Sequence, residues 1–216
     1  MTMASPLIGR RDAIRVLGVT TLGLGAAWRS TSAVECILTP AQTEGPYYVA
    51  DATTRRDITE GKPGVPLRIR LTVRDATTCQ KLPGAQVEIW HCDAAGVYSG
   101  VNGAADTTTF LRGRQVSDRK GKVLFDTIYP GWYTGRTPHI HVKVHVSGTT
   151  VHTGQLYFDD TVTRAVYQKE PYAARGAADT TNTTDGIYAS GGTQSQLGLR
   201  RRRRTVRGNA TLVVST

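Results

Sequence analysis

The chain has 216 residues and a formal net charge of +10, and 39% of its residues are hydrophobic. This length is enough for one domain with a substantial core. No stretch beyond the first residues is long and apolar enough to cross a bilayer, so we expect no membrane span in the mature form.

The first 33 residues have the order of an export signal. The twin-arginine pair Arg10-Arg11 is followed by an apolar run from Val16 to Ala27 and then by small residues ending at Ala33. An N-terminal helix or membrane anchor is the alternative, but the apolar run is too short to span a bilayer. We predict that residues 1–33 are a twin-arginine signal peptide, that residues 34–216 form the domain, and that the protein is periplasmic or extracellular.

Most of the positive charge lies near the two ends of the chain. Four arginines fall in the predicted signal, and a second group comprises Arg200 to Arg204 together with Arg207. We interpret residues 198–216 as an arginine-rich, solvated tail, with contact to a polyanion through Arg200–Arg204 as the alternative. Because an exported protein does not meet the genome, we expect no nucleic-acid partner.

Three cysteines are present, and outside the cytoplasm a pair of them is expected to oxidise. Cys79 lies in a predicted turn and Cys92 at the far end of the following strand, which is too long a separation for a disulfide. Cys36 is therefore expected to pair with either Cys79 or Cys92, leaving one free thiol.

After an irregular arm at residues 36–49, the chain has the pattern of short strands rather than helices. Apolar and polar residues alternate from Leu67 to Val73, as in a half-buried strand. Further strands are expected at residues 85–91, 123–128, 139–146 and 156–158, with an edge strand at 211–214. The predicted fold is all-β, a β-sandwich of mostly antiparallel strands with long loops and irregular N- and C-terminal arms.

The stretch from Tyr129 to Val146 carries the most polar chemistry. His139 and His141 fall on the same face of a predicted strand, which is how a strand offers two ligands to one metal. Upstream, the Pro130-Gly131 turn leads to Tyr133, and Arg136 lies three residues before His139. A phenol, a guanidinium and two imidazoles together exceed what a structural strand requires.

A second tyrosine, Tyr98, follows a strand end and a glycine, so its side chain can project out of the sheet. Two tyrosines with two histidines suit ferric iron, because phenolate is a hard anionic donor, whereas zinc favours His, Cys and carboxylate ligands. A free phenol has a pKa near ~10, so only a strongly acidic cation makes two phenolates favourable at neutral pH.

Five motifs in order resemble the intradiol ring-cleavage dioxygenases, a family of non-haem ferric enzymes that open catechols. The motifs are TEGPYY at residues 43–48, IWHCDAAGVYS at 89–99, FLRGRQ at 110–115, YPGWYTGRTPHIHV at 129–142 and TGQLYF at 153–158. The export signal and the short length are closest to an exported bacterial branch of that family.

The resemblance assigns roles to particular residues. It implies that Fe(III) is held by Tyr98, Tyr133, His139 and His141, that Arg136, Gln155 and Tyr133 act in catalysis, and that Gly45, Pro46 and Tyr47 wall the substrate pocket.

The implied reaction inserts both atoms of O2 into a catechol-type aromatic and cleaves the ring between its two hydroxylated carbons. The product is a diacid of the cis,cis-muconate type, and the expected partners are a small aromatic diol and O2. The resemblance implies no organic cofactor, and the sequence does not predict the preferred catechol or the oligomeric state.

Two other functions are compatible with parts of the pattern. One is a non-catalytic, transthyretin-like β-sandwich binding module, which would have no reason to keep two tyrosines beside an HxH pair. The other is a zinc hydrolase or lyase using His139, His141 and His145. His145 lies four residues beyond His141, roughly 13 Å along an extended strand, which is too far to share one ion easily.

Overall fold

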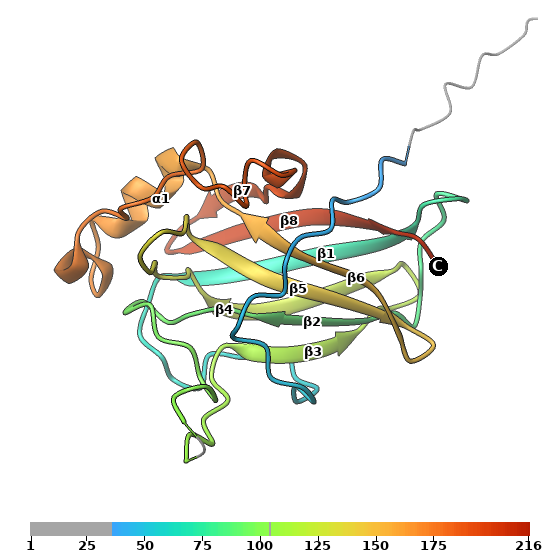
Figure 1. Cartoon of the computed structure of the whole chain (residues 1–216), viewed down its shortest axis with the longest axis horizontal. Helices are drawn as coiled ribbons and strands as arrows, with labels where there is room; N and C mark the ends of the chain where they lie inside the picture. Colours follow the sequence, from blue (N-terminus) through green and yellow to red (C-terminus); the bar gives the residue numbers. More distant parts are fainter. Residues whose placement is uncertain (1–35, 104) are drawn as a thin grey trace, which may run out of the picture. The chain divides into compact units, whose positions relative to one another are not determined.

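Eight strands form two four-stranded sheets in the computed structural model, which describes residues 36–103 and 105–216 (Figure 1). The first sheet has the order β4 (Lys122–Ile128), β1 (Pro66–Asp75), β8 (Thr205–Val214), β7 (Gly198–Arg202). The second has the order β3 (Arg112–Val116), β2 (Gln86–Trp90), β5 (His139–Val146), β6 (Thr149–Tyr157). All neighbouring strands are antiparallel except β1 and β8, which are parallel.

The predicted signal peptide at residues 1–33 lies outside the described residues, so it stays a prediction. Within the described part of the chain, none of the helices has the length and apolar character needed to cross a membrane. These helices are α1 (Asp160–Tyr167) and the short 3-10 helices Tyr172–Arg175 and Gly192–Ser195.

The core lies between the inner faces of the two sheets. Leu67, Ile69, Leu71 and Val73 of β1 are buried there against Ile140, Val142 and Val144 of β5. The alternation read from the sequence thus places one face of each strand in a shared apolar layer. The prediction of an all-β sandwich is confirmed.

The outer face of the second sheet is covered by segments from both ends of the chain. The arm at residues 36–50 crosses this face (Figure 1), and Gln42 donates a backbone hydrogen bond to Thr153 of β6. The segment after α1 returns to the same face, where Leu197 donates to Tyr157. Polar side chains that point outward from β5 and β6 are therefore buried beneath irregular structure.

The interpretation of residues 198–216 as a solvated tail is wrong, because β7 and β8 are strands of the first sheet. β8 lies between β1 and β7 and buries Val206, Leu212 and Val214. The arginine run hid this pattern because three of the five residues of β7 are arginines and none of the five is buried, while the buried residues of β8 alternate only in its first half. The predicted edge strand at 211–214 is thus part of an interior strand.

Two further elements were not expected from the sequence. α1 begins after Asp159, whose carboxylate accepts hydrogen bonds from the backbone N–H groups of Thr161 and Val162, as N-cap residues do. β3 has the sequence RGRQV, which lacks apolar alternation, yet it pairs with β2 along its whole length. Backbone pairing therefore defines β3, which no alternation of apolar side chains predicts.

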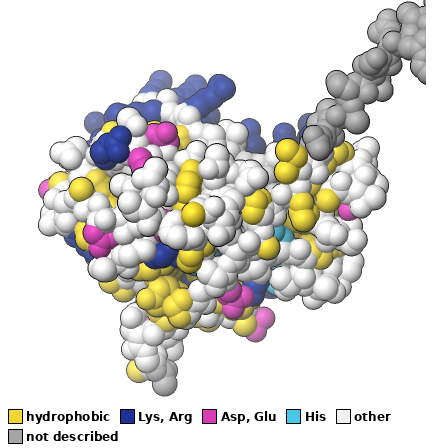
Figure 2. Space-filling view, turned by 45° about the horizontal axis from the view of Figure 1, so that its top comes forward, with side chains coloured by type: hydrophobic (Ala, Val, Ile, Leu, Met, Phe, Trp, Pro, Cys, Tyr) yellow, Lys and Arg dark blue, Asp and Glu magenta, His cyan; other side chains and the backbone are white. Residues whose placement is uncertain are grey.

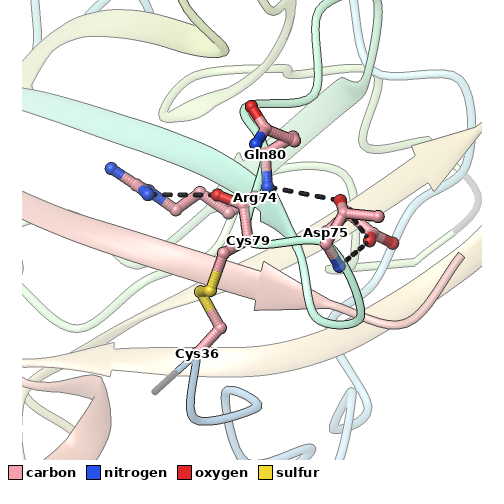
Figure 3. The surroundings of a disulfide bond; sticks show 6 residues. Cys36, Arg74, Asp75, Cys79 and Gln80 are labelled. Atoms are coloured by element: carbon pink, nitrogen blue, oxygen red, sulfur yellow. Dashed lines mark hydrogen bonds between the residues drawn. A yellow bond between two sulfur atoms is a disulfide. The ribbon is translucent and has the colours of Figure 1, made fainter. Parts of the chain in front are cut away.

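A disulfide joins Cys36 to Cys79 and ties the start of the arm to the turn after β1 (Figure 3). The turn is held by Asp75, whose carboxylate accepts from the backbone and hydroxyl of Thr78. Arg74 also donates to the carbonyl oxygen of Cys79 at 3.1 Å. The choice left open by the sequence is settled as Cys36–Cys79, and Cys92 is the buried free thiol.

Candidate metal centre

Strand β5 presents His139 and His141 on the outer face of the second sheet, beneath the arm. Both side chains are almost fully buried, at 2% and 1% exposure, and their Nε2 atoms are 3.1 Å apart. The imidazole of His141 stacks on the indole of Trp90 on β2, with ring centroids 4.9 Å apart and an interplanar angle of 5°. The two imidazoles therefore meet at one point and are held there by packing.

The hydrogen bonding of His139 selects one tautomer. Its Nδ1–H donates to the carbonyl oxygen of Thr137 at 2.7 Å, so Nε2 carries the lone pair. Burial lowers the pKa of His139 to about 3 and lowers that of His141 well below its usual value. Both rings are neutral, which is the form that binds a metal.

Tyr133 reaches the histidines from the loop that follows β4. Its Oη lies 3.1 Å from Nε2 of His139. The loop packs closely on the segment after β2, since a Cβ on Gly131 would lie 2.4 Å from the carbonyl oxygen of Asp93. A glycine at this position allows the backbone approach that delivers Tyr133.

Tyr98 arrives from the loop between β2 and β3. Its ring centroid is 5.8 Å from that of Tyr133 and 6.1 Å from that of His141. Its Oη is buried without a hydrogen-bond partner among the described residues. An unsatisfied buried hydroxyl is costly, so this atom indicates a ligand position.

These four side chains fit a ferric ion on the chemistry of their donor atoms. Burial raises the pKa of Tyr98 well above its usual value and that of Tyr133 to about 12, so without a cation both phenols stay protonated. A trivalent cation would stabilise both phenolates and accept the lone pairs of the two imidazoles.

The zinc alternative is not favoured by this geometry. In residues 36–103 and 105–216, no group of three or more His, Cys, Asp or Glu side chains converges as a metal site. His145 follows a bulge in β5, and its Nδ1 is 3.0 Å from the hydroxyl of Thr150 instead. A site here needs the tyrosines.

Arg136 stands beside the histidines in a fixed position. Its Nη1 lies 3.5 Å from Nε2 of His139, and its Nη2 donates to Oε1 of Gln155 at 2.5 Å. Gln155 is held in turn, because its Nε2 donates to the carbonyl oxygen of Thr43 in the arm. The predicted pair of Arg136 and Gln155 therefore forms a single hydrogen-bonded unit at the site.

The arm brings two of its three predicted residues to the site. Tyr47 stacks on Tyr98 with centroids 4.4 Å apart and meets Tyr133 edge-on at 5.8 Å. Gly45 has a φ of +70°, and a Cβ there would lie 3.4 Å from Cε1 of His141. Pro46, between them, is exposed to solvent.

Sequence reasoning missed Asp185, which anchors Arg136. One carboxylate oxygen accepts from Nε of Arg136 and from the backbone N–H of Thr137, both at 2.8 Å. The other accepts from the backbone N–H groups of Ile187 and Tyr188. Asp185 lies in a segment rich in threonine and glycine with no periodic pattern, so no local signal marked it.

Comparison with known proteins identifies the family. The model of a family described as dioxygenase matches residues 43–168, more than half of the chain. A chlorocatechol 1,2-dioxygenase from Pseudomonas putida is 30% identical over 158 residues, covering 65% of this chain and 59% of that enzyme. A catechol 1,2-dioxygenase from Pseudomonas sp. (strain EST1001) is 35% identical over 100 residues, covering 44% of this chain and 32% of that enzyme. The chain thus spans between about a third and three fifths of these curated relatives.

Solved structures match over more of their length. An intradiol ring-cleavage dioxygenase from Tetranychus urticae is 33% identical with a TM-score of 0.79, covering 83% of this chain and 95% of that one. A dioxygenase domain from Streptomyces sp. SirexAA-E is 31% identical with a TM-score of 0.65, covering 83% of this chain and 99% of that one. With the sandwich and the family match, these likenesses show that the chain belongs to the intradiol ring-cleavage dioxygenase family.

Proposed function

We propose that this protein is a non-haem Fe(III)-dependent intradiol dioxygenase that cleaves a catechol between its two hydroxylated carbons. The observation that carries the proposal is the convergence of Tyr133, His139 and His141 beside the buried, unpartnered Oη of Tyr98. The family to which the chain belongs supports iron as the metal, and the relatives' names support a small aromatic diol as substrate.

Tyr98, Tyr133, His139 and His141 would hold the iron. Bound Fe(III) would supply a Lewis acid that binds the deprotonated catechol and draws electron density from its ring towards reaction with O2. Both oxygen atoms of O2 enter the product, so the electron balance closes without a reductant. The product of catechol itself would be cis,cis-muconate.

The chain's own residues would handle protons and charge. Tyr133 is the less buried of the two tyrosines, and as a metal-bound phenolate its Oη could receive a catechol proton. Arg136 places a fixed positive charge beside His139, where it can stabilise negative charge that develops on the substrate. Gln155 and Asp185 hold that guanidinium in place, and Tyr47 restricts access from the arm side.

The decisive experiment combines iron analysis with an isotope label. The purified full chain should contain about one iron and show a red-brown tyrosinate-to-Fe(III) absorption, and with ¹⁸O2 it should yield a diacid carrying two labelled oxygens. A colourless protein active with zinc alone, or a product with a single labelled oxygen, would sink the proposal.

A matched pair of variants tests the ligand assignment. Tyr98→Phe should weaken the absorption band, because only the Tyr133 phenolate remains, and reduce turnover by more than about a thousandfold, more than the usual cost of one preorganised donor. Tyr48→Phe is the control, because Tyr48 packs against Trp90 near the site but its hydroxyl donates to Glu88. It should keep iron and colour.

We also propose that residues 1–33 are a twin-arginine signal and that residues 34–216 act outside the cytoplasm. The Cys36–Cys79 disulfide supports this address, because such bonds persist mainly in oxidising compartments. Replacing Arg10 and Arg11 with lysine should retain the protein in the cytoplasm. Unchanged export of that variant would show that the address is wrong.

A further inference from the structure

Three arginines lie side by side across the outer face of the first sheet. Arg68 of β1 is paired in register with Arg207 of β8, and Arg207 is paired with Arg200 of β7. Their neighbours in sequence, such as Leu67 and Val206, point into the core, so the arginines point outward. Arg70 adds a fourth guanidinium, one outward position along β1 from Arg68.

Most of this charge is not neutralised within the protein. Asp126 of β4 is the acid in this row, and it already bonds both Arg68 at 2.5 Å and Arg56 at 2.9 Å. In the described part of the chain, Arg70, Arg200 and Arg207 have no ion pair and no side-chain hydrogen bond. Like charges directly opposite each other on neighbouring strands destabilise a sheet. A contribution to stability therefore does not explain why three arginines lie in this row.

The arginines surround a depression rather than a smooth surface. A cavity of about 240 Å³ is lined by Arg68, Arg70, Leu124, Arg200, Arg207, Gly208 and Asn209. It combines guanidiniums with one amide and one aliphatic side chain. Three more arginines, Arg202 to Arg204, follow at the end of β7, and lysines and arginines gather along the upper edge of Figure 2, on the side of β7 and β8 in Figure 1.

We propose that this face, the arginine face (Arg68, Arg70, Arg200, Arg207 and Asn209), binds an acidic polysaccharide through its carboxylates. An unpaired guanidinium matches a carboxylate with two parallel hydrogen bonds. Asn209 can both donate to and accept from sugar hydroxyls, and Leu124 offers an apolar contact for the face of a sugar ring. The run of arginines beyond the depression suits a ligand with repeated charges rather than a single small anion.

Two other polyanions fit the face less well. Single-stranded nucleic acid is usually bound by aromatic side chains that stack on bases, and no aromatic residue lines this depression. A lipid surface favours exposed apolar side chains beside the charges. The large exposed hydrophobic residues of the described chain are Ile37, Leu38, Val49, Val97 and Val116, and none belongs to the first sheet.

The site is separate from the candidate metal centre, since the two lie on the outer faces of different sheets. The proposal does not depend on the catalytic activity. It would hold the enzyme on a carboxylate-rich matrix through the first sheet and leave the second sheet out of the contact.

The test measures binding of the full chain to polygalacturonate, with neutral galactan, single-stranded DNA and phosphatidylserine-containing vesicles as competitors. Binding to polygalacturonate should be strongest and should weaken as salt rises. The variant Arg200→Gln/Arg207→Gln should bind about thirtyfold more weakly, at about 1 kcal/mol for each of the two cations near an anionic surface.

A control of equal charge is Arg119→Gln/Lys120→Gln, in the exposed turn before β4. It should bind polygalacturonate as the parent does, and far-UV circular dichroism should show all variants folded. Every variant keeps the arginines of residues 1–33, so a difference in affinity between variants comes from the substituted positions on the arginine face or in the control turn. If the double variant does not fold, two other variants replace it, Arg70→Gln and Arg200→Lys/Arg207→Lys. Each should bind polygalacturonate more weakly, the first because it loses a charge and the second because lysine cannot form two parallel hydrogen bonds with a carboxylate.

Several results would overturn the proposal. They are no binding of polygalacturonate at low salt, equal weakening by the control variant, and equal affinity for neutral galactan. Tighter binding of DNA or of the vesicles would show that the face serves a different polyanion.

Discussion

The two outer faces of the sandwich hold their cations in opposite ways. On the second sheet, Arg136 is bound by Asp185 and Gln155 and is covered by chain segments from both ends. On the first sheet, Arg207 and Arg200 are exposed and have no partner among the described residues. A guanidinium held under cover has one orientation and a strong local field, whereas an exposed one is mobile and screened by salt.

This contrast fits the two proposals, in which one face carries out chemistry and the other binds a polymer. A reacting substrate needs charges at fixed positions in a site that excludes water. A polymer needs many weak contacts that tolerate variation in position. Arginine can fill both roles because its surroundings differ between the two faces.

The largest effect is expected from removing the strands that form the arginine face, since this should unfold the whole domain. Deleting residues 198–216 should prevent folding, because β8 pairs with β1 and buries Val206, Leu212 and Val214. Burying each such side chain stabilises by about 1.5–3 kcal/mol, which together approaches a total stability of about 5–15 kcal/mol.

Solubility and far-UV circular dichroism check this prediction. Replacing Arg202, Arg203 and Arg204 with glutamine removes charge but keeps both strands, so that protein should fold. A truncated chain that unfolds cooperatively would show that β8 is dispensable.

The covered face is tested next by Arg136→Ala. Turnover of a soluble catechol should fall by roughly a hundredfold to a thousandfold, the usual cost of losing one preorganised charge. Iron content and colour should stay at the parent level, because Arg136 is not among the four donors. Full activity in this variant would remove Arg136 from the mechanism.

A smaller loss is expected from Asp185→Asn, which weakens the hold on Arg136 without removing its charge. We expect kcat to fall about tenfold, with iron content unchanged, as for a partner that orients a catalytic group. The control Asp179→Asn alters a carboxylate that bonds to Gly135 and Thr180 in the same region. If Asp185→Asn and Asp179→Asn have equal kcat values, Asp185 has no special role in positioning.

The smallest effect concerns stability on the open face. Arg207→Gln should raise the free energy of unfolding by about 0.2–1 kcal/mol at low salt, because it removes like charges opposite Arg68 and Arg200. The gain should shrink at high salt. Thermal unfolding of Arg68→Gln provides the control, since that change removes the ion pair with Asp126 and should not stabilise. A lower stability of Arg207→Gln would mean that its side chain has favourable contacts.

Local pattern in the sequence was enough to predict the fold class, and the resemblance to a known family implied the four candidate ligands. Alternation along β1 and β5 depends only on the two-residue period of a strand, which any single segment displays. Tyr98, Tyr133, His139 and His141 were found from motifs, and the structure brings all four to one place.

Tertiary structure alone decided the remaining features. Asp185 reaches Arg136 across 49 positions, and Trp90 stacks on His141 because the register pairs β2 with β5. The arginine run became a strand because its neighbour β8 pairs with β1 on one side and with β7 on the other. Apart from the pairing of β7 with β8, each of these contacts joins segments that are distant in the sequence, and such contacts leave no periodic pattern in either segment.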